Sequence, residues 1–123
     1  MSKTHPTLVS FGYAFSGLRA ALKKEPNIRI HLSLALLAII LAFFLNFNPT
    51  EWIILAFTIA FVLILELINT TLEALVNLVS PEIREEAKVA KDVSAAAVLI
   101  SALLSVVVGA FLRDRLAQPH RRR

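Results

Sequence analysis

Four polar side chains recur on one face of an otherwise apolar stretch in the middle of the sequence. Glu66, Asn69, Glu73 and Asn77 follow one another at spacings of three, four and four residues. At about 100° per residue, these spacings place all four within roughly 80° of arc on a helix. Carboxylate oxygens with a neighbouring amide, in a chain that lacks cysteine, suit a hard cation such as Mg²⁺.

The apolar surroundings of this face make its two carboxylates unusual. A charged residue inside a membrane span costs on the order of 2.5–3.5 kcal/mol on insertion scales. The carboxylates of Glu66 and Glu73 would therefore have to meet water, a cation or each other. A structural polar contact between helices is one interpretation of the face. We favour a functional site, because it also explains why four polar groups are aligned.

A basic and acidic pair lies where the next apolar run begins. Lys91 is followed by Asp92, and such a lysine pairs with phosphate as a point charge or extends to the membrane interface as a boundary residue. With Glu25 and Arg29 near the same membrane face, the pair favours a phosphate–metal site. Phosphoryl transfer requires positioning, a metal and a base near the acceptor hydroxyl, and Glu66 suits the last task.

Glycine content excludes the nucleotide-binding loops of soluble proteins. The chain has three glycines, Gly12, Gly17 and Gly109. They cannot form a Walker loop or a Rossmann fingerprint. If the chain uses ATP, it does so with another architecture.

Composition indicates which elements must hold these residues. The chain has 123 residues and is 57% hydrophobic, above the roughly 45–50% of soluble domains. Charged residues make up 18% and gather in the first thirty positions, between Glu82 and Asp92, and after Arg113. The net charge of +4 lies beside apolar segments, which indicates contact with a membrane surface and not a nucleic-acid interface. The absence of cysteine excludes disulfides and thiolate chemistry.

Apolar periodicity predicts an all-α membrane protein with a single domain over residues 1–123. An amphipathic surface helix is expected at 8–24, followed by spans at about 30–48, 52–79 and 93–112 and a flexible tail at 117–123. Trp52 is a predicted interface anchor, and Ser80 with Pro81 is a predicted helix start. No cleavable signal peptide is recognisable. Three short spans cannot enclose a hydrophilic site alone, so an oligomeric bundle is expected.

Lysine and arginine placement predicts the orientation. The N-terminal segment and the second loop are basic, whereas the first loop has no basic residue. The N-terminus and the polar face should therefore be cytoplasmic. The arginines after Arg113 then fall outside, against the rule, but later charges usually count for less.

Three blocks of the sequence resemble the prokaryotic diacylglycerol kinase family, which includes the undecaprenol kinases. Residues 66–77, with the pattern Glu-x-x-Asn-Thr-x-x-Glu, resemble its signature, and residues 90–98 resemble its second block. Residues 12–19 and the following Glu25 resemble its N-terminal surface helix. The resemblance covers about residues 11–111 in the same order.

The resemblance implies a homotrimer of three-span subunits in the bacterial inner membrane, with composite sites at the cytoplasmic interface. Such an enzyme transfers the γ-phosphate of Mg-ATP to a lipid hydroxyl. By position, Glu66 resembles the general base and Asn69 its positioning neighbour, while the metal ligands correspond to Glu25 and Glu73. The nucleotide or lipid contacts correspond to Lys91, Asp92, Tyr13, Ser16 and Arg19.

Two positions depart from the family pattern. Asn77 stands where the family usually has Asp, which removes a charge from a contact near the nucleotide. Pro26 follows Glu25, where the family generally has a residue that allows a continuous turn. Residues 27–31 resemble the undecaprenol branch more than the diacylglycerol branch, and His31 is interpreted as an interfacial residue of the first span.

Two alternatives to a lipid kinase remain at this stage. Intramembrane carboxylates also serve small oligomeric transporters or channels as proton or cation sites. That interpretation is disfavoured by the cytoplasmic position of Glu66 and Glu73 and by the nearby Lys91. A family member without activity is the other alternative, encouraged only by Asn77.

Overall fold

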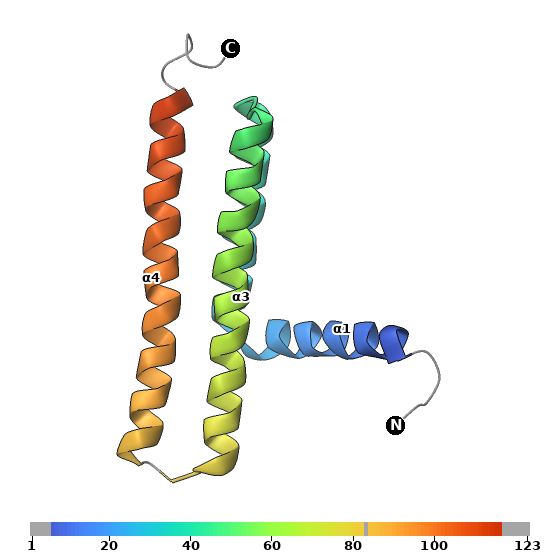
Figure 1. Ribbon diagram of the computed structural model, residues 1–123, viewed down its shortest axis with the longest axis vertical. Coiled ribbons are helices and arrows are strands. Elements are labelled where there is room, and N and C mark those ends of the chain that lie inside the picture. Colours follow the sequence, from blue (N-terminus) through green and yellow to red (C-terminus); the bar gives the residue numbers. More distant parts are fainter. Residues whose placement is uncertain (1–5, 83, 117–123) are drawn as a thin grey trace.

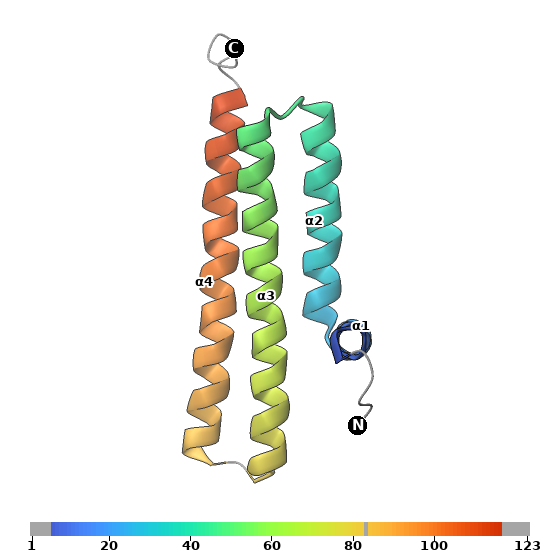
Figure 2. The same cartoon turned by 45° about the vertical axis from the view of Figure 1, so that its right-hand side comes forward.

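The protein is a bundle of three long helices with a fourth helix lying crosswise at its side. The computed structural model describes residues 6–82 and 84–116. Its helices are α1 (Pro6–Lys24), α2 (Pro26–Phe44), α3 (Pro49–Val79) and α4 (Glu85–Leu116). Helix α3 packs against both α2 and α4, while α1 contacts α2 and leads away from the bundle (Figures 1 and 2). The predicted all-α fold, with an N-terminal helix and three candidate spans, is confirmed.

Helix ends differ from the predicted bounds where polar residues continue a helix. Helix α2 begins at Pro26, before the expected span at 30–48, and α4 begins at Glu85, before the span at 93–112. The acidic first turn of α4 favours a helix N-terminus. The prediction that Ser80 starts a helix is wrong: its N–H bonds to the carbonyl of Val76, so Ser80 closes α3. The predicted tail at 117–123 lies outside the described residues.

The turn between α2 and α3 is fixed by its own side chains and backbone. Asn46 adopts a left-handed conformation (φ 54°), and the Phe47 N–H bonds to the carbonyl of Ala42, as in a Schellman motif. Asn48 and Glu51 then form a reciprocal capping box that starts α3. The predicted anchor Trp52 packs edge-on against two aromatic rings, that of Phe43 in the last turn of α2 and that of Phe47 in the connection.

The corner between α1 and α2 sets α1 crosswise to the bundle (Figure 1). Glu25 is extended (φ −111°, ψ 105°) because the following Pro26 disfavours helical geometry at the preceding residue. Ala21 and Ile28 are buried on either side of this corner. The corner therefore sets both the direction of α1 and the position of the Glu25 side chain.

The surface of the bundle is that of a membrane protein. Helices α2, α3 and α4 are each long and apolar enough to cross a bilayer. Among described hydrophobic residues, the buried ones are Ala21, Ile28, Ala42, Val62 and Leu112. The remaining apolar surface faces outward, where lipid or other subunits would cover it. The ends of α3 and α4 that the 80–84 loop joins extend past the level of α1 (Figures 1 and 2).

Candidate active site on the polar face of α3

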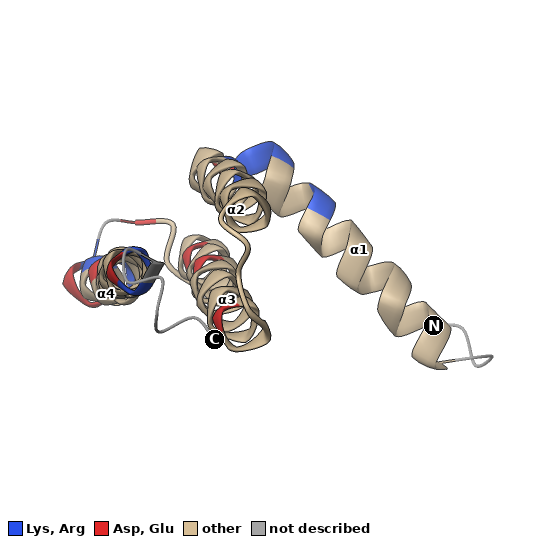
Figure 3. Ribbon diagram, turned by 90° about the horizontal axis from the view of Figure 1, so that it is seen from above, with Lys and Arg blue, Asp and Glu red and all other residues tan. Residues whose placement is uncertain are grey.

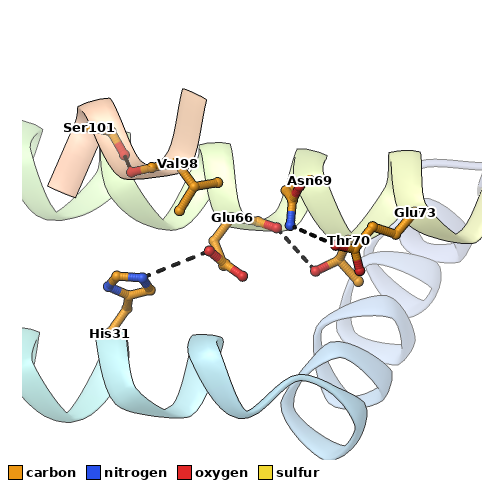
Figure 4. A network of polar contacts seen from close by, with 7 residues as sticks. All are labelled: His31, Glu66, Asn69, Thr70, Glu73, Val98 and Ser101. Atoms are coloured by element: carbon orange, nitrogen blue, oxygen red, sulfur yellow. Dashed lines mark hydrogen bonds and ion pairs between the residues drawn. The ribbon is translucent and has the colours of Figure 1, made fainter. Parts of the chain in front are cut away.

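Glu66 is the centre of the polar face. Its side chain is 1% exposed and lies on the central helix, directed toward α2 (Figure 4). The Oε2 atom lies 3.8 Å from Nε2 of His31 on α2. Neither carboxylate oxygen has a hydrogen-bond partner within the described part of the chain. A buried carboxylate without hydrogen bonds is costly, so such a group calls for an explanation in function.

The next turns of α3 continue the face toward the loop. Asn69 is buried, and its Nδ2 donates to Oε1 of Glu73 at 3.4 Å (Figure 4). Its Oδ1 is buried without a hydrogen-bond partner among the described residues. The Thr70 hydroxyl donates to the backbone carbonyl of Glu66 at 3.1 Å. The sequence spacing thus describes a real face of aligned polar groups, with two of them still able to accept hydrogen bonds.

The corner before α2 brings a third carboxylate to this face. Glu25 is half-buried, and its charge acts on Glu66 together with the charge of Glu73. Seen along the bundle, the ribbon of α3 carries acidic positions on several of its turns (Figure 3). The predicted metal ligands Glu25 and Glu73 are therefore both within electrostatic range of the predicted base.

The carboxylates near Glu66 suit a cation that takes most of its ligands from water and substrate phosphates. Within residues 6–82 and 84–116, no group of three or more acidic, histidine or cysteine side chains is arranged to hold a metal ion. Mg²⁺ usually binds one or two carboxylates and completes its shell with water and substrate phosphates. Glu25 and Glu73 supply two carboxylates, and a cation beside them would offset the repulsion among the carboxylates that act on Glu66.

A basic hollow lies where α3 and α4 meet the loop. It has a volume of about 310 Å³, and its lining includes Asn77, Arg84, Lys88 and Lys91. Lys91 Nζ donates to Oδ1 of Asn77 at 2.6 Å, and Lys88 Nζ donates to Oδ2 of Asp92 at 2.8 Å. The predicted phosphate contact, Lys91, thus lies beside the residue that departs from the family pattern. The lining also holds the carboxylate of Glu82, 3.9 Å from Arg84. Three basic side chains against one acidic side chain suit an anion such as a polyphosphate.

The predicted contacts on α1 are not gathered with Glu66 in a single chain. Tyr13, Ser16 and Arg19 are exposed on the helix that leads away from the bundle (Figure 1). Ser16 and Arg19 line a hollow of about 420 Å³ formed by α1 residues alone. In the described ranges, no hydrogen bond or ion pair joins these three side chains to the polar face.

His31 is the residue of this site that sequence reasoning missed. It was interpreted as an interfacial residue because it stands alone at the head of a span. Its contact with Glu66 depends on how α2 packs against α3, and spacing along one helix carries no signal of that packing.

Comparison with known proteins gives one consistent result. The family model described as prokaryotic diacylglycerol kinase matches residues 12–112. A diacylglycerol kinase of Synechocystis sp. is 42% identical over 106 residues, which is 85% of this chain and 61% of that protein. A diacylglycerol kinase of Escherichia coli K12 is 34% identical, covering 82% of this chain and 83% of its own length. An undecaprenol kinase of Bacillus subtilis is 33% identical, with 81% of each chain covered.

Proposed function

This chain belongs to the prokaryotic diacylglycerol kinase family, and from that premise we propose that it transfers the γ-phosphate of Mg-ATP to the hydroxyl of a membrane lipid alcohol. Its relatives are named for two acceptors, diacylglycerol and undecaprenol. Both are membrane lipids with a single reactive hydroxyl. The acceptor of this chain is one of these two alcohols.

The burial of Glu66 carries the proposal. A lipid hydroxyl stays at the level of the membrane, so its base must lie on a membrane helix near the polar boundary. Glu66 is 1% exposed on α3, and both of its oxygens lack hydrogen-bond partners among the described residues. A carboxylate left free to accept a proton, in a site closed to bulk water, has the properties of a general base.

Glu66 acts as the general base of the transfer. Its carboxylate accepts the proton of the lipid hydroxyl as the hydroxyl oxygen attacks the γ-phosphorus. The new oxygen–phosphorus bond forms as the bond between the γ-phosphorus and the bridging oxygen breaks, and ADP leaves with that oxygen. Asn69 lies one turn along α3 and holds Glu73 by a hydrogen bond, which keeps both oriented toward the reacting groups.

The remaining residues hold the nucleotide and the metal. Mg²⁺, when bound, neutralises the developing charge on the phosphates. Glu25 and Glu73 are its proposed ligands. Lys91 meets the phosphates and Asn77 supports the nucleotide site, both from the lining of the basic hollow, while Asp92 supports it through its bond to Lys88. Further contacts to nucleotide or lipid come from α1, where Ser16 and Arg19 line a hollow and Tyr13 is exposed.

The proposal includes assembly and orientation, with the number of subunits taken from the family resemblance. The outward apolar surface of α2, α3 and α4 and the projecting α1 suit packing between copies of the chain, and we propose a homotrimer. In such an assembly α1 of one subunit lies beside the helices of another, so the α1 residues join a site that a single chain leaves incomplete. The N-terminus and the site face the cytoplasm of a bacterial inner membrane.

The test is phosphate transfer to the two lipids side by side. The purified protein in mild detergent receives ATP labelled at the γ-phosphate, with diacylglycerol or undecaprenol as the acceptor. We expect label in one of the two lipids, dependent on Mg²⁺ and lost when a chelator removes the metal. Restoring Mg²⁺ restores transfer if the metal acts in the reaction and not in folding.

Failure of the assay has a defined meaning. No transfer to either lipid, from a protein shown to be folded and oligomeric, would contradict the kinase proposal. Transfer that persists with all divalent cations removed would contradict the roles of Glu25 and Glu73.

A further inference from the structure

His31 on α2 is a close polar neighbour of Glu66 from another helix. The Nε2 and Oε2 atoms are 3.8 Å apart, and the His31 side chain is 20% exposed while that of Glu66 is 1% exposed. Figure 4 shows the imidazole of α2 facing the carboxylate across the gap between the helices. The other charges acting on Glu66, those of Glu25 and Glu73, are carboxylates that repel it.

The surroundings of His31 direct its polar edge toward Glu66. His31 lines a cavity of about 190 Å³ between α2, α3 and α4 whose walls are mostly aliphatic. The two hydroxyls in that lining donate to backbone carbonyls, Thr58 to Ile54 and Ser105 to Ala102, and can offer the imidazole only a neutral acceptor, which is weaker than a carboxylate. Glu66 is therefore the strongest acceptor that the imidazole faces.

We propose that His31 is a positioning residue for Glu66, donating a hydrogen bond from Nε2 to Oε2 when the lipid hydroxyl is bound. This bond leaves Oε1 to accept the proton of the hydroxyl. The present separation exceeds a hydrogen bond of about 2.7–3.2 Å, and catalytic hydrogen bonds often tighten only in the substrate complex. The inference rests on the proposed role of Glu66 as the base.

A donor at this point affects turnover and not substrate affinity. His31 is placed to contact Glu66, which reacts with the hydroxyl, whereas the basic hollow and α1 hold the nucleotide. Without the His31 donor, the buried carboxylate of Glu66 would be free to rotate away from the acceptor hydroxyl. The chemical step would slow while the KM values for lipid and ATP stay unchanged.

The test compares three variants with the unaltered protein. His31→Leu removes the donor, His31→Gln keeps an N–H donor without an imidazole, and Ser33→Leu is a matched polar-to-apolar control, exposed on the same helix. We expect His31→Leu to lower kcat by about tenfold or more, with both KM values within about twofold. His31→Gln should recover most of the lost kcat, and Ser33→Leu should match the unaltered protein.

A second measurement examines the pair without relying on activity. Thermal unfolding in detergent, with the lipid acceptor present, is recorded for His31→Leu in the unaltered background and in the Glu66→Gln background. If His31 pairs with the carboxylate, the two losses in Tm differ, because the glutamine side chain no longer carries the charge that the donor stabilises. Equal losses would contradict the pairing.

The outcomes separate this inference from the kinase proposal. An active unaltered protein whose kcat survives His31→Leu would overturn the role of His31 and leave the kinase proposal standing. Equal kcat losses in His31→Leu and His31→Gln would overturn the hydrogen bond. If the unaltered protein transfers phosphate to neither lipid, the kinase proposal fails, and the unfolding cycle still decides whether the two side chains pair.

Discussion

At the scale of single residues, exposure along the polar face of α3 rises from one end to the other. Glu66 is 1% exposed, Asn69 is 7% exposed, Glu73 is half-buried and Asn77 is exposed. One helix therefore presents polar groups from a buried position to an exposed one. In the proposed reaction, the buried end would serve the lipid acceptor and the exposed end the nucleotide, with the rise of a single helix between them.

Asn77, at the exposed end of this face, allows its contact with Lys91 to be tested. Its Oδ1 accepts a hydrogen bond of 2.6 Å from Lys91 Nζ. Asn77→Asp converts this bond to an ion pair, and at a partly exposed position we expect about 0.5 kcal/mol of added stability at low salt. Thermal unfolding in detergent at low and high ionic strength would measure it. A gain that high salt leaves unchanged, or a loss of stability, would contradict the contact.

The sequence predicts this face because its information is local. Glu66, Asn69 and Glu73 lie on one helix, so their spacing alone aligns them. His31 could not be assigned in the same way. Its contact with Glu66 depends on the rotation and register of α2 against α3, which are set by packing between helices.

At the scale of elements, two short connections control where the helices lie. At one, Pro26 keeps Glu25 extended, so α1 leaves the bundle and Glu25 faces the polar face. At the other, the capping box of Asn48 and Glu51 starts α3 and so fixes the register of the whole face. Both connections use proline at the first turn of the following helix, where its missing N–H costs nothing.

Removing the cap of α3 should reduce stability. Asn48 accepts from the N–H of Glu51 at 2.9 Å, and the Glu51 carboxylate accepts from the N–H of Asn48 at 2.9 Å. Asn48→Ala should lower the free energy of unfolding by about 1 kcal/mol. Unfolding in detergent would measure the loss, with the exposed Thr50→Ala as a control on the same turn. Equal stability of the two variants would show that the capping box contributes little.

Helix existence was easier to predict from the sequence than helix ends. Long apolar runs identified all three bundle helices, because length and apolarity are properties of the run itself. The start of α4 was misplaced, since Ser80 and Pro81 resemble a helix start but follow directly on α3. The chain closes α3 at Ser80 through its backbone N–H and resumes helix only at Glu85.

At the scale of the whole molecule, the chain leaves most of its apolar surface exposed. Large apolar side chains stay exposed on every long helix, including Phe44, Phe57 and Val106. Lipid covers such a surface, and so does a second copy of the chain. The polar face lies near the level at which α1 joins the bundle, and the basic hollow lies beyond it, where α3 and α4 end (Figure 1). The other hollow lies on α1 itself. An assembly that brings α1 of one copy to the polar face of another would complete the site.

The central claim is that a carboxylate buried on a membrane helix removes the proton from a lipid hydroxyl. The most direct measurement is the phosphate-transfer rate of Glu66→Gln, which keeps the size of the side chain and removes the base. The control is Glu86→Gln, which changes an exposed carboxylate in the first turn of α4. We predict that Glu66→Gln lowers kcat by roughly 10²–10⁴-fold in a protein that stays folded and oligomeric, while Glu86→Gln stays at the unaltered rate. A folded Glu66→Gln variant that phosphorylates lipid at the unaltered rate would contradict the account.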